Sequence, residues 1–305
     1  MSDSWKLTLP CTKAEAETLA GDIAPLAEID PVPVLMTSEP DPDKPDEWQL
    51  DVYFEGEPDT ATIAQIRKLV PSASRRHPVI ERLPDADWVT ISQAGLEPIR
   101  AGRFFVHTAA FTDQIPAGAT AFHIEAGLAF GTGQHETTTG CLMMLDRMKR
   151  RGAIHRNLLD LGTGTGLLAF AAMRLWPHAR ATASDIDPIS IDVTRENAVA
   201  NNVRLGTLPG ALALAVAPGL DHPILIHHAP YDLIIANILA QPLIDLAPSV
   251  AAALEPGGAL ILAGLLDSQA ERVANAYRRQ GLRLADRIDR GDWPTLMLRK
   301  RRRIA

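Results

Sequence analysis

The fold of this chain is constrained most by a glycine-rich stretch that directly follows a short apolar run. Residues 158–166 read Leu-Leu-Asp-Leu-Gly-Thr-Gly-Thr-Gly, and an apolar helical pattern extends from Leu167 to Leu175. Glycines allow the backbone to turn sharply, and they leave no side chain to obstruct a ligand that lies on the turn. A buried strand that passes through such a turn into a helix predicts a cofactor-binding α/β domain.

Strands and helices alternate strictly from this point onward, as they do in a parallel sheet that has helices on both faces. Short apolar runs, typical of buried parallel strands, occupy residues 158–161, 181–184, 233–236 and 259–263. Strand-like runs also occur at 103–107, 120–124, 282–288 and 295–299, the last two joined by a turn. We therefore predict a doubly wound, mostly parallel sheet, although residues 203–230 show no clear pattern.

The N-terminal part of the chain has a different order, strand-helix-strand-strand-helix-strand, which is the split βαβ or ferredoxin-like pattern. Its expected elements span residues 5–9, 12–26, 32–36, 48–54, 60–70 and 79–83. Thr12 and Glu15 have the spacing of a capping box, and Asp59 is the expected N-cap of the second helix. The predicted division is a small α+β domain at 1–84, a linker at 85–102 and a larger α/β domain at 103–305.

Charge and cysteine content narrow the class of protein. The net charge is −7 at pH 7, so the surface as a whole is not built for nucleic acid, and the basic run at 299–303 is expected to be a solvated tail. Cys11 and Cys141 lie far apart and in no metal-binding spacing, which suits a reducing compartment. The first ten residues lack a signal-peptide pattern, and no apolar run approaches the roughly 18 residues of a membrane span. We expect a cytoplasmic protein without membrane contact.

The spacing of the three glycines distinguishes between cofactors. A dinucleotide site requires Gly-x-Gly-x-x-Gly, with a helix N-terminus facing the pyrophosphate. Here Gly166 follows Gly162 and Gly164 one residue early, and Leu167 takes the expected position. S-adenosylmethionine has no pyrophosphate, so this spacing favours it over a nicotinamide dinucleotide. Asp160 is then expected to bind the methionine ammonium, directly or through water, and the alternative is a glycine turn without a ligand.

An acidic pair follows the next predicted strand. Asp185 lies where a carboxylate can accept hydrogen bonds from both ribose hydroxyls of an adenosine. The alternative is that Asp185 or Asp187 only caps the following helix. Both functions are compatible, and we assign the ribose to Asp185 and the cap to Asp187, with Pro188 at the first helical position.

Asn237 ends another apolar strand, at the sheet edge where open α/β folds bind their ligands. A carboxamide there can orient an amine towards a methyl group, although a polar residue that merely ends a strand is the alternative. Methyltransferases that act on planar amides or DNA bases commonly continue with Pro-Pro-aromatic. This chain continues with Ile-Leu-Ala at 238–240 and has no aromatic platform, which favours an aliphatic amine.

A second glycine-bearing segment, at 130–138, reads Phe-Gly-Thr-Gly-Gln-His-Glu-Thr-Thr and leads into a helical pattern at 139–148. Its threonines are expected to cap the helix, and His135 is either structural, solvated or the acceptor of a proton. Three other histidines have no companion ligand at metal-binding spacing, so we predict that they lie at the surface and hold no metal: His222, His227 and His228.

These motifs occur in an order that resembles the PrmA family, the bacterial methyltransferases of large-subunit ribosomal protein L11. The resemblance rests on segments 127–138, 160–166, 185–187 and 236–240. It covers the C-terminal domain well and the N-terminal domain in pattern only. It implies that the cofactor contacts fall on Thr138, Gly162, Asp185 and Asn237.

The resemblance also implies a class I S-adenosylmethionine-dependent enzyme that N-methylates lysine side chains and the N-terminal α-amine of L11. The N-terminal domain would hold L11, free or before assembly into the large subunit, without direct recognition of nucleic acid. A lysine amine has a pKa of about 10.4 in water, so it must lose a proton before it reacts. The proton would pass to His135, or to water as the site desolvates the amine.

Other functions are compatible with parts of this pattern. A protein-lysine methyltransferase with another substrate, such as an electron-transfer flavoprotein, would carry the same motifs. A nicotinamide-dependent oxidoreductase is disfavoured by the glycine spacing. A non-catalytic RNA-binding protein is disfavoured because Trp48 to Phe54 lacks the pattern of an RNA-recognition strand.

Overall fold

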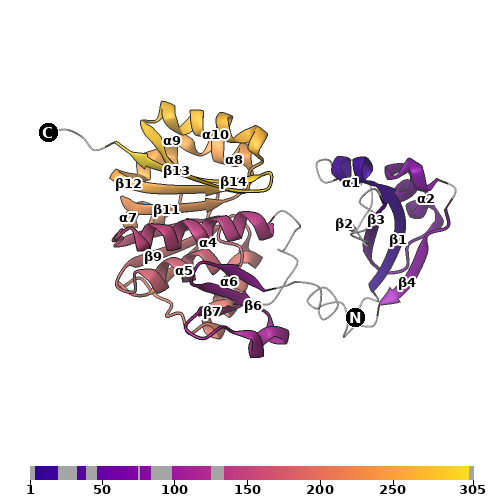
Figure 1. Cartoon of the computed structure of the whole chain (residues 1–305), viewed down its shortest axis with the longest axis horizontal. Helices are drawn as coiled ribbons and strands as arrows, with labels where there is room; N and C mark the ends of the chain where they lie inside the picture. The colour runs from indigo at the N-terminus through magenta and orange to yellow at the C-terminus, as the bar shows by residue number, and fades with distance from the viewer. Residues whose placement is uncertain are drawn as a thin grey trace. The chain divides into compact units, whose positions relative to one another are not determined.

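The computed structural model describes residues 4–19, 33–38, 47–74, 76–83, 98–124 and 134–301. The chain divides into two compact units, Met1–Ala94 and Gly95–Ala305, whose elements are labelled in Figure 1. Most of the stretch predicted as a linker, 85–102, lies outside the described residues. Its last part contains strand β5, Ile99–Ala101.

In the N-terminal unit the described residues form a four-stranded antiparallel sheet in the order β2-β3-β1-β4. Helix α1 follows β1 and helix α2 follows β3, which is the predicted ferredoxin-like arrangement. The elements are β1 (Ser4–Thr12), α1 (Lys13–Leu19), β2 (Val34–Ser38), β3 (Glu47–Glu55), α2 (Thr60–Leu69) and β4 (Val79–Leu83). The later part of the helix predicted for 12–26 lies outside the described residues.

Polar side chains determine where these two helices begin. The Thr12 hydroxyl accepts from the N–H of Glu15 at 3.3 Å, and the Glu15 carboxylate accepts from the N–H of Thr12 at 2.8 Å. The predicted capping box is therefore confirmed. Asp59 accepts from the N–H of Thr62 at 2.7 Å and caps α2, also as predicted. The core of this unit includes Leu7, Leu9, Leu50, Val52 and Ile66, all fully buried.

In the C-terminal unit the described residues form a seven-stranded sheet in the order β10-β9-β8-β11-β12-β14-β13. The first five strands are parallel, and β14 and β13 extend the edge as an antiparallel hairpin, which confirms the predicted mostly parallel sheet. The strands are β8 (Asn157–Leu161), β9 (Arg180–Asp185), β10 (Leu212–Val216), β11 (Tyr231–Asn237), β12 (Leu254–Ala263), β13 (Leu282–Arg290) and β14 (Trp293–Lys300). A separate small sheet contains β5, β6 (Phe104–His107) and β7 (Thr120–His123).

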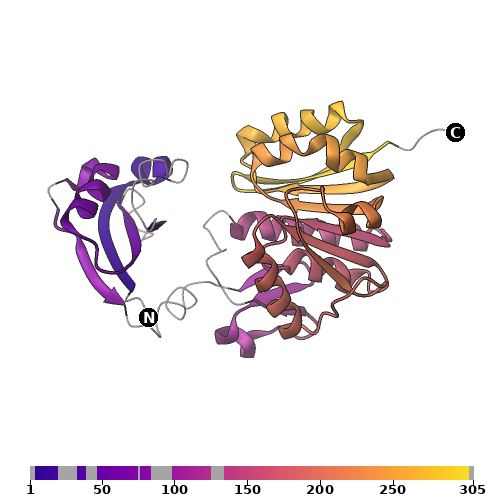
Figure 2. The same cartoon turned by 180° about the vertical axis from the view of Figure 1, so that it is seen from behind.

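Helices cover both faces of the large sheet (Figure 2). The central strands accordingly bury side chains on both sides. In β11, Ile235 packs into a core shared with α4 and α5, whereas Ile234 packs into a core shared with α8, α9 and α10. The alternation explains why the strand sequence is apolar throughout. The helices are α4 (Gln134–Arg150), α5 (Leu167–Leu175), α6 (Pro188–Ala200), α7 (Pro223–His228), α8 (Ala240–Asp245), α9 (Ala247–Ala253) and α10 (Asp267–Arg279).

The structure corrects the interpretation of residues 203–230. This stretch, which has no clear pattern in the sequence, contains β10 and α7. His228 is not at the surface: it is buried, and its Nδ1 shares a hydrogen bond with the Thr182 hydroxyl at 2.8 Å. Burial lowers the pKa of His228. His222 accepts from the N–H of Ile224 and caps α7, while His227 is exposed.

Helix α4 also differs from its prediction. It begins at Gln134 instead of Thr139, so Thr137 and Thr138 lie within the helix and do not cap it. Both threonines are buried. Gln134, His135 and Glu136 form the first turn of the helix in place of the expected loop.

The parts of the chain that the structure describes contain no helix long and apolar enough to cross a membrane. The same residues contain no group of three His, Cys, Asp or Glu side chains arranged to hold a metal ion.

Candidate active site

Three of the predicted motifs emerge side by side at the carboxyl edge of the large sheet. Leu161 of β8 pairs with Ser184 of β9 on one side and with Ala236 of β11 on the other. The N–H of Gly162 donates to the Ser184 carbonyl at 2.8 Å. The glycine turn, the acidic pair after β9 and the segment from Asn237 therefore meet at one place, where open α/β sheets bind their ligands.

Two glycines of the turn have different surroundings: Gly162 is closely packed, whereas the backbone at Gly164 is open. A Cβ on Gly162 would lie 2.2 Å from Cγ2 of Ile238, so the approach of these two segments requires glycine. A Cβ on Gly164 would have no described heavy atom within 4 Å. The backbone at Gly164 therefore leaves the space that a cofactor lying across the turn requires.

Two polar side chains of α6 donate hydrogen bonds to the backbone of the glycine turn. The Thr194 hydroxyl donates to the carbonyl of Gly164 at 2.8 Å, and the Asn197 amide donates to the carbonyl of Thr165 at 3.0 Å. Both side chains are buried. Neither side chain belongs to a predicted motif, although polar residues three positions apart on one helix face are a detectable signal in the sequence.

Asp160 is buried beneath the turn and has one unsatisfied oxygen. Its Oδ2 accepts from the Thr163 hydroxyl at 2.8 Å and from the N–H of Ala169 at 3.0 Å. Its Oδ1 is buried without a hydrogen-bond partner among the described residues. Burial raises the pKa of Asp160 to about 6, against the opposing effect of these hydrogen bonds. A cationic group beside Oδ1 would supply the missing partner and favour the ionised carboxylate.

The two acidic residues after β9 make different contacts, and the predicted helix cap is confirmed at Asp187. Asp187 accepts from the N–H of Ile189 at 2.9 Å and caps α6, with Pro188 in the first turn. Asp185 instead accepts from the N–H of Gly164 at 2.9 Å and from the N–H of Asp187 at 3.1 Å. The Asp185 carboxylate is thus fixed against the glycine turn, half-buried, with lone pairs left to accept from a ligand.

The end of β11 contacts the first part of α4. The Asn237 amide donates to the Thr138 hydroxyl, with 3.3 Å between Nδ2 and Oγ1. This bond brings together two predicted site residues that are far apart in the sequence. The preceding loop, 125–133, and the side chain of His135 lie outside the described residues.

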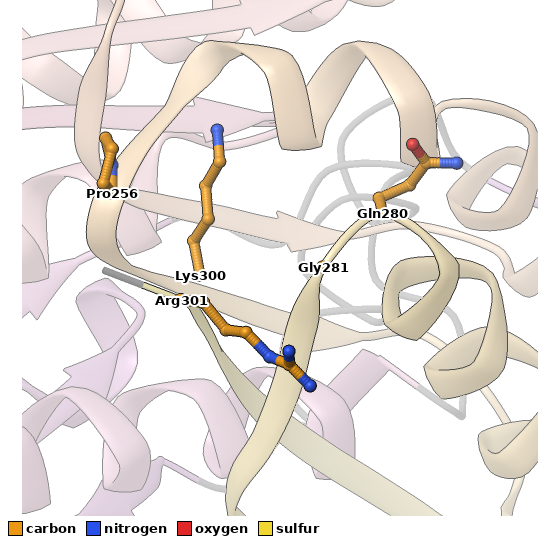
Figure 3. Close-up of a pocket in the computed structure, with 5 residues that line it drawn as sticks. All are labelled: Pro256, Gln280, Gly281, Lys300 and Arg301. Carbon is orange, nitrogen blue, oxygen red and sulfur yellow. The ribbon is translucent and has the colours of Figure 1, made fainter. Parts of the chain in front are cut away.

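A hollow of about 240 Å³ lies elsewhere in the C-terminal unit and contains none of the predicted site residues (Figure 3). Its lining residues are Pro256, Gln280, Gly281, Lys300 and Arg301. The Lys300 ammonium donates to the carbonyls of Ala251 and Leu254, at 2.6 Å each. Lys300 therefore satisfies the end of α9, which is a structural role.

Comparisons with known proteins point to one family. A family model described as ribosomal protein L11 methyltransferase (PrmA) matches residues 6–301. The chain is 41% identical over 288 residues to a ribosomal protein L11 methyltransferase of Mesorhizobium japonicum, covering 94% of this chain and 96% of that protein. It is 44% identical over 268 residues to the protein of the same name from Agrobacterium fabrum, covering 87% and 89%.

A solved structure gives the same result for the fold. The ribosomal protein L11 methylase of Lactobacillus delbrueckii subsp. bulgaricus superposes with a TM-score of 0.55 at 27% identity, covering 67% of this chain and 98% of that one. The family match extends over nearly the whole sequence and includes each of the motifs that meet at the carboxyl edge. This chain belongs to the ribosomal protein L11 methyltransferase family.

Proposed function

We propose that this chain transfers the methyl group of S-adenosylmethionine to amines of ribosomal protein L11, on lysine side chains and on the N-terminal α-amine. The proposal is carried by one observation: strand β8 lies between β9 and β11 in register, so Asp160, the glycine turn, Asp185 and Asn237 lie at the carboxyl ends of three adjacent strands. The names of the family model and of the two relatives described above refer to methylation of L11 and support the same substrate.

The residues at this edge fit S-adenosylmethionine. The unsatisfied Oδ1 of Asp160 would accept from the methionine ammonium, and the Asp185 carboxylate would accept from the ribose hydroxyls. The open backbone at Gly164 leaves room for the cofactor between them, with Gly162 and Thr138 at its borders. When bound, the cofactor supplies a methyl group on a sulfonium, which is already a reactive electrophile.

Asn237 positions the amine in this proposal. Its Nδ2 donates to Thr138, so its Oδ1 is the atom left to accept a hydrogen bond from the incoming amine. Accepting an amine N–H turns the nitrogen lone pair away from Asn237 and towards the methyl group. The segment that follows Asn237 continues with Ile238 and Leu239, which present no aromatic platform and suit the aliphatic chain of lysine.

The substrate amine must be neutral before it reacts. A lysine ammonium, with an ordinary pKa of about 10.4, loses its proton more easily when it leaves water for an apolar site. We propose His135, which lies in the first turn of α4, as the acceptor of that proton. Loss of the proton to water during desolvation is the alternative, and the activity of a His135→Gln variant distinguishes the two.

The N-terminal unit is the proposed recognition module for L11. A protein substrate needs a larger contact area than a methyl-transfer pocket offers, and a tethered domain also raises the effective concentration of the target amine. We propose that the enzyme acts in the cytoplasm on free L11, before assembly, without contacting RNA. Free L11 should therefore be a better substrate than large ribosomal subunits.

The decisive experiment incubates the purified full chain with S-adenosylmethionine and one protein acceptor at a time. The acceptors are free L11, intact large subunits and an electron-transfer flavoprotein, and mass spectrometry locates any methyl groups. We expect methylated lysines and a methylated N-terminus on free L11. Methylation of the flavoprotein with none on L11 would leave the chemistry intact and replace the substrate, whereas binding of a nicotinamide dinucleotide instead of S-adenosylmethionine would refute the proposal entirely.

A further inference from the structure

We propose that Gly264 is a positioning residue for methyl transfer, because its contact with the backbone of Ile238 fixes the neighbouring Asn237. Gly264 directly follows β12, and Ala263 at the end of that strand pairs with Asn237 at the end of β11. The turns that leave these two adjacent strands therefore lie against each other. The inference rests on the proposed role of Asn237 in holding the amine.

The contact between the two turns is too close for any side chain. A Cβ on Gly264 would lie 2.4, 2.8 and 2.9 Å from the carbonyl oxygen, carbonyl carbon and nitrogen of Ile238. Real Cβ atoms essentially never approach another heavy atom within 3.0 Å. All three atoms belong to the backbone, so no side-chain rotation relieves the overlap. Gly264 also has a φ of +82°, a conformation that residues with a Cβ rarely adopt.

Ile238 is held from a second side by the glycine turn. A Cβ on Gly162 would lie 2.2 Å from the Cγ2 atom of Ile238. The backbone of Ile238 thus contacts Gly264 and its side chain contacts Gly162. Since Asn237 is bonded directly to Ile238, these two glycines set the position from which its carboxamide reaches Thr138 and the amine.

The arrangement predicts a selective defect. An alanine at position 264 must push its own turn and the Ile238 backbone apart by several tenths of an ångström, which disturbs the position of Asn237 beside Ile238. Asp160 and Asp185, the proposed ammonium and ribose contacts, are fixed by hydrogen bonds to Thr163, Ala169 and Gly164 that do not involve Gly264. A misplacement of about 1 Å near the reacting atoms can cost about 100-fold in rate. The chemical step should therefore suffer more than cofactor binding.

The test compares Gly264→Ala with Gly281→Ala. Gly281 has nearly the same backbone conformation, with a φ of +86°, but a Cβ there would have no described heavy atom within 4 Å. The control therefore carries the backbone strain without the contact, and it lies outside the proposed site. We expect Gly264→Ala to lower kcat for L11 about 10- to 100-fold. The Kd for S-adenosylmethionine by calorimetry and the KM for L11 should change less than about threefold, and Gly281→Ala should match the wild type in all three.

Two further variants make each outcome informative. Ile238→Ala removes the side-chain contact with Gly162 but keeps the backbone contact with Gly264, so it measures the second contact separately and should lower kcat about three- to tenfold. Asn237→Ala tests the underlying function. If Asn237→Ala loses activity while a folded Gly264→Ala keeps wild-type kcat, the positioning role of Gly264 is overturned. A Gly264→Ala chain that fails to fold also overturns it, in favour of a purely structural role. If Asn237→Ala itself remains fully active, the proposed role of Asn237 fails, and that failure is separate.

Discussion

Arg290 at the end of β13 donates a hydrogen bond to the carboxylate of Glu136 in the first turn of α4, with 2.8 Å between Nε and Oε2. Both side chains are 41% exposed, so the ion pair contributes little to global stability. Its importance lies in its position, because the same turn of α4 leads to Thr138 and its hydrogen bond with Asn237. The pair therefore joins the C-terminal hairpin to the candidate active site.

We expect Arg290→Ala to lower the free energy of unfolding by only about 0.2–1 kcal/mol. The rate of L11 methylation should fall by more than this small loss of stability explains, because the first turn of α4 loses its hydrogen bond to β13. Arg287→Ala is the matched control: Arg287 lies on the same strand and pairs with Asp267 and Asp289, away from α4. Thermal unfolding and methylation assays on both variants would contradict this prediction if the two lost activity equally.

The two acidic residues after β9 should separate binding from stability. Asp185→Ala removes the proposed ribose contact, a charged hydrogen-bonding partner worth about 1.5–3 kcal/mol, so the affinity for S-adenosylmethionine should fall about 10- to 100-fold. Asp187→Ala removes the cap of α6 and should cost about 0.5–2 kcal/mol of stability, with little effect on affinity. Calorimetry and thermal denaturation measure both quantities. Equal cofactor affinities for Asp185→Ala and the wild type would show that Asp185 is structural only.

Asp160 should make cofactor binding dependent on pH. Its pKa is raised to about 6 in the folded chain, above the roughly 3.9 of an unfolded aspartate. The folded state therefore binds more protons between these values, and the stability that this protonation contributes is present below about pH 4 and lost as the pH rises through 6. The ammonium of S-adenosylmethionine requires the ionised form, so its affinity should fall as the pH drops below 6.

This prediction has a direct calorimetric signature. At pH 6, binding of S-adenosylmethionine should release protons from Asp160, and the apparent enthalpy should depend on the ionisation enthalpy of the buffer. Asp160→Asn cannot titrate and should lose both the proton release and the decline in affinity at low pH. An Asp160→Asn variant that kept the pH dependence would assign it to another group.

The two units should separate substrate recognition from cofactor binding. A fragment of residues 95–305 contains the whole C-terminal unit, including β5. We expect it to fold, to bind S-adenosylmethionine nearly as well as the full chain, and to lose most methylation of L11 even at high substrate concentration. Circular dichroism, calorimetry and mass spectrometry test the three parts. Equal methylation by fragment and full chain would remove the recognition role from the N-terminal unit.

The local features of this fold could be predicted from the sequence because each depends on residues close together in the chain. The capping box at Thr12 and Glu15, the cap at Asp187 and the glycine turn at 162–166 all have short-range signatures. The alternation of strands and helices then placed Asp185 and Asn237 at one sheet edge.

Features that depend on tertiary packing could not be predicted in the same way. The burial of His228 depends on Thr182, a strand residue 46 positions earlier. The support of the glycine turn by Thr194 and Asn197 likewise requires knowing how α6 packs. Strand β10 lies within the run Ala-Leu-Ala-Leu-Ala-Val-Ala at 211–217, and the period of such a short apolar run does not distinguish a strand from a buried helix.

The alternation in β11 has a consequence for how faithfully the enzyme assembles. Ile234 and Ile235 fill cores on opposite sides of the sheet, so a slip of one residue would send every side chain of the strand to the wrong face. The same slip would carry Asn237 away from Thr138. A mispaired chain would therefore lose the core packing and the site contact together. The position of Asn237 in the candidate active site therefore depends on the pairing register of strand β11.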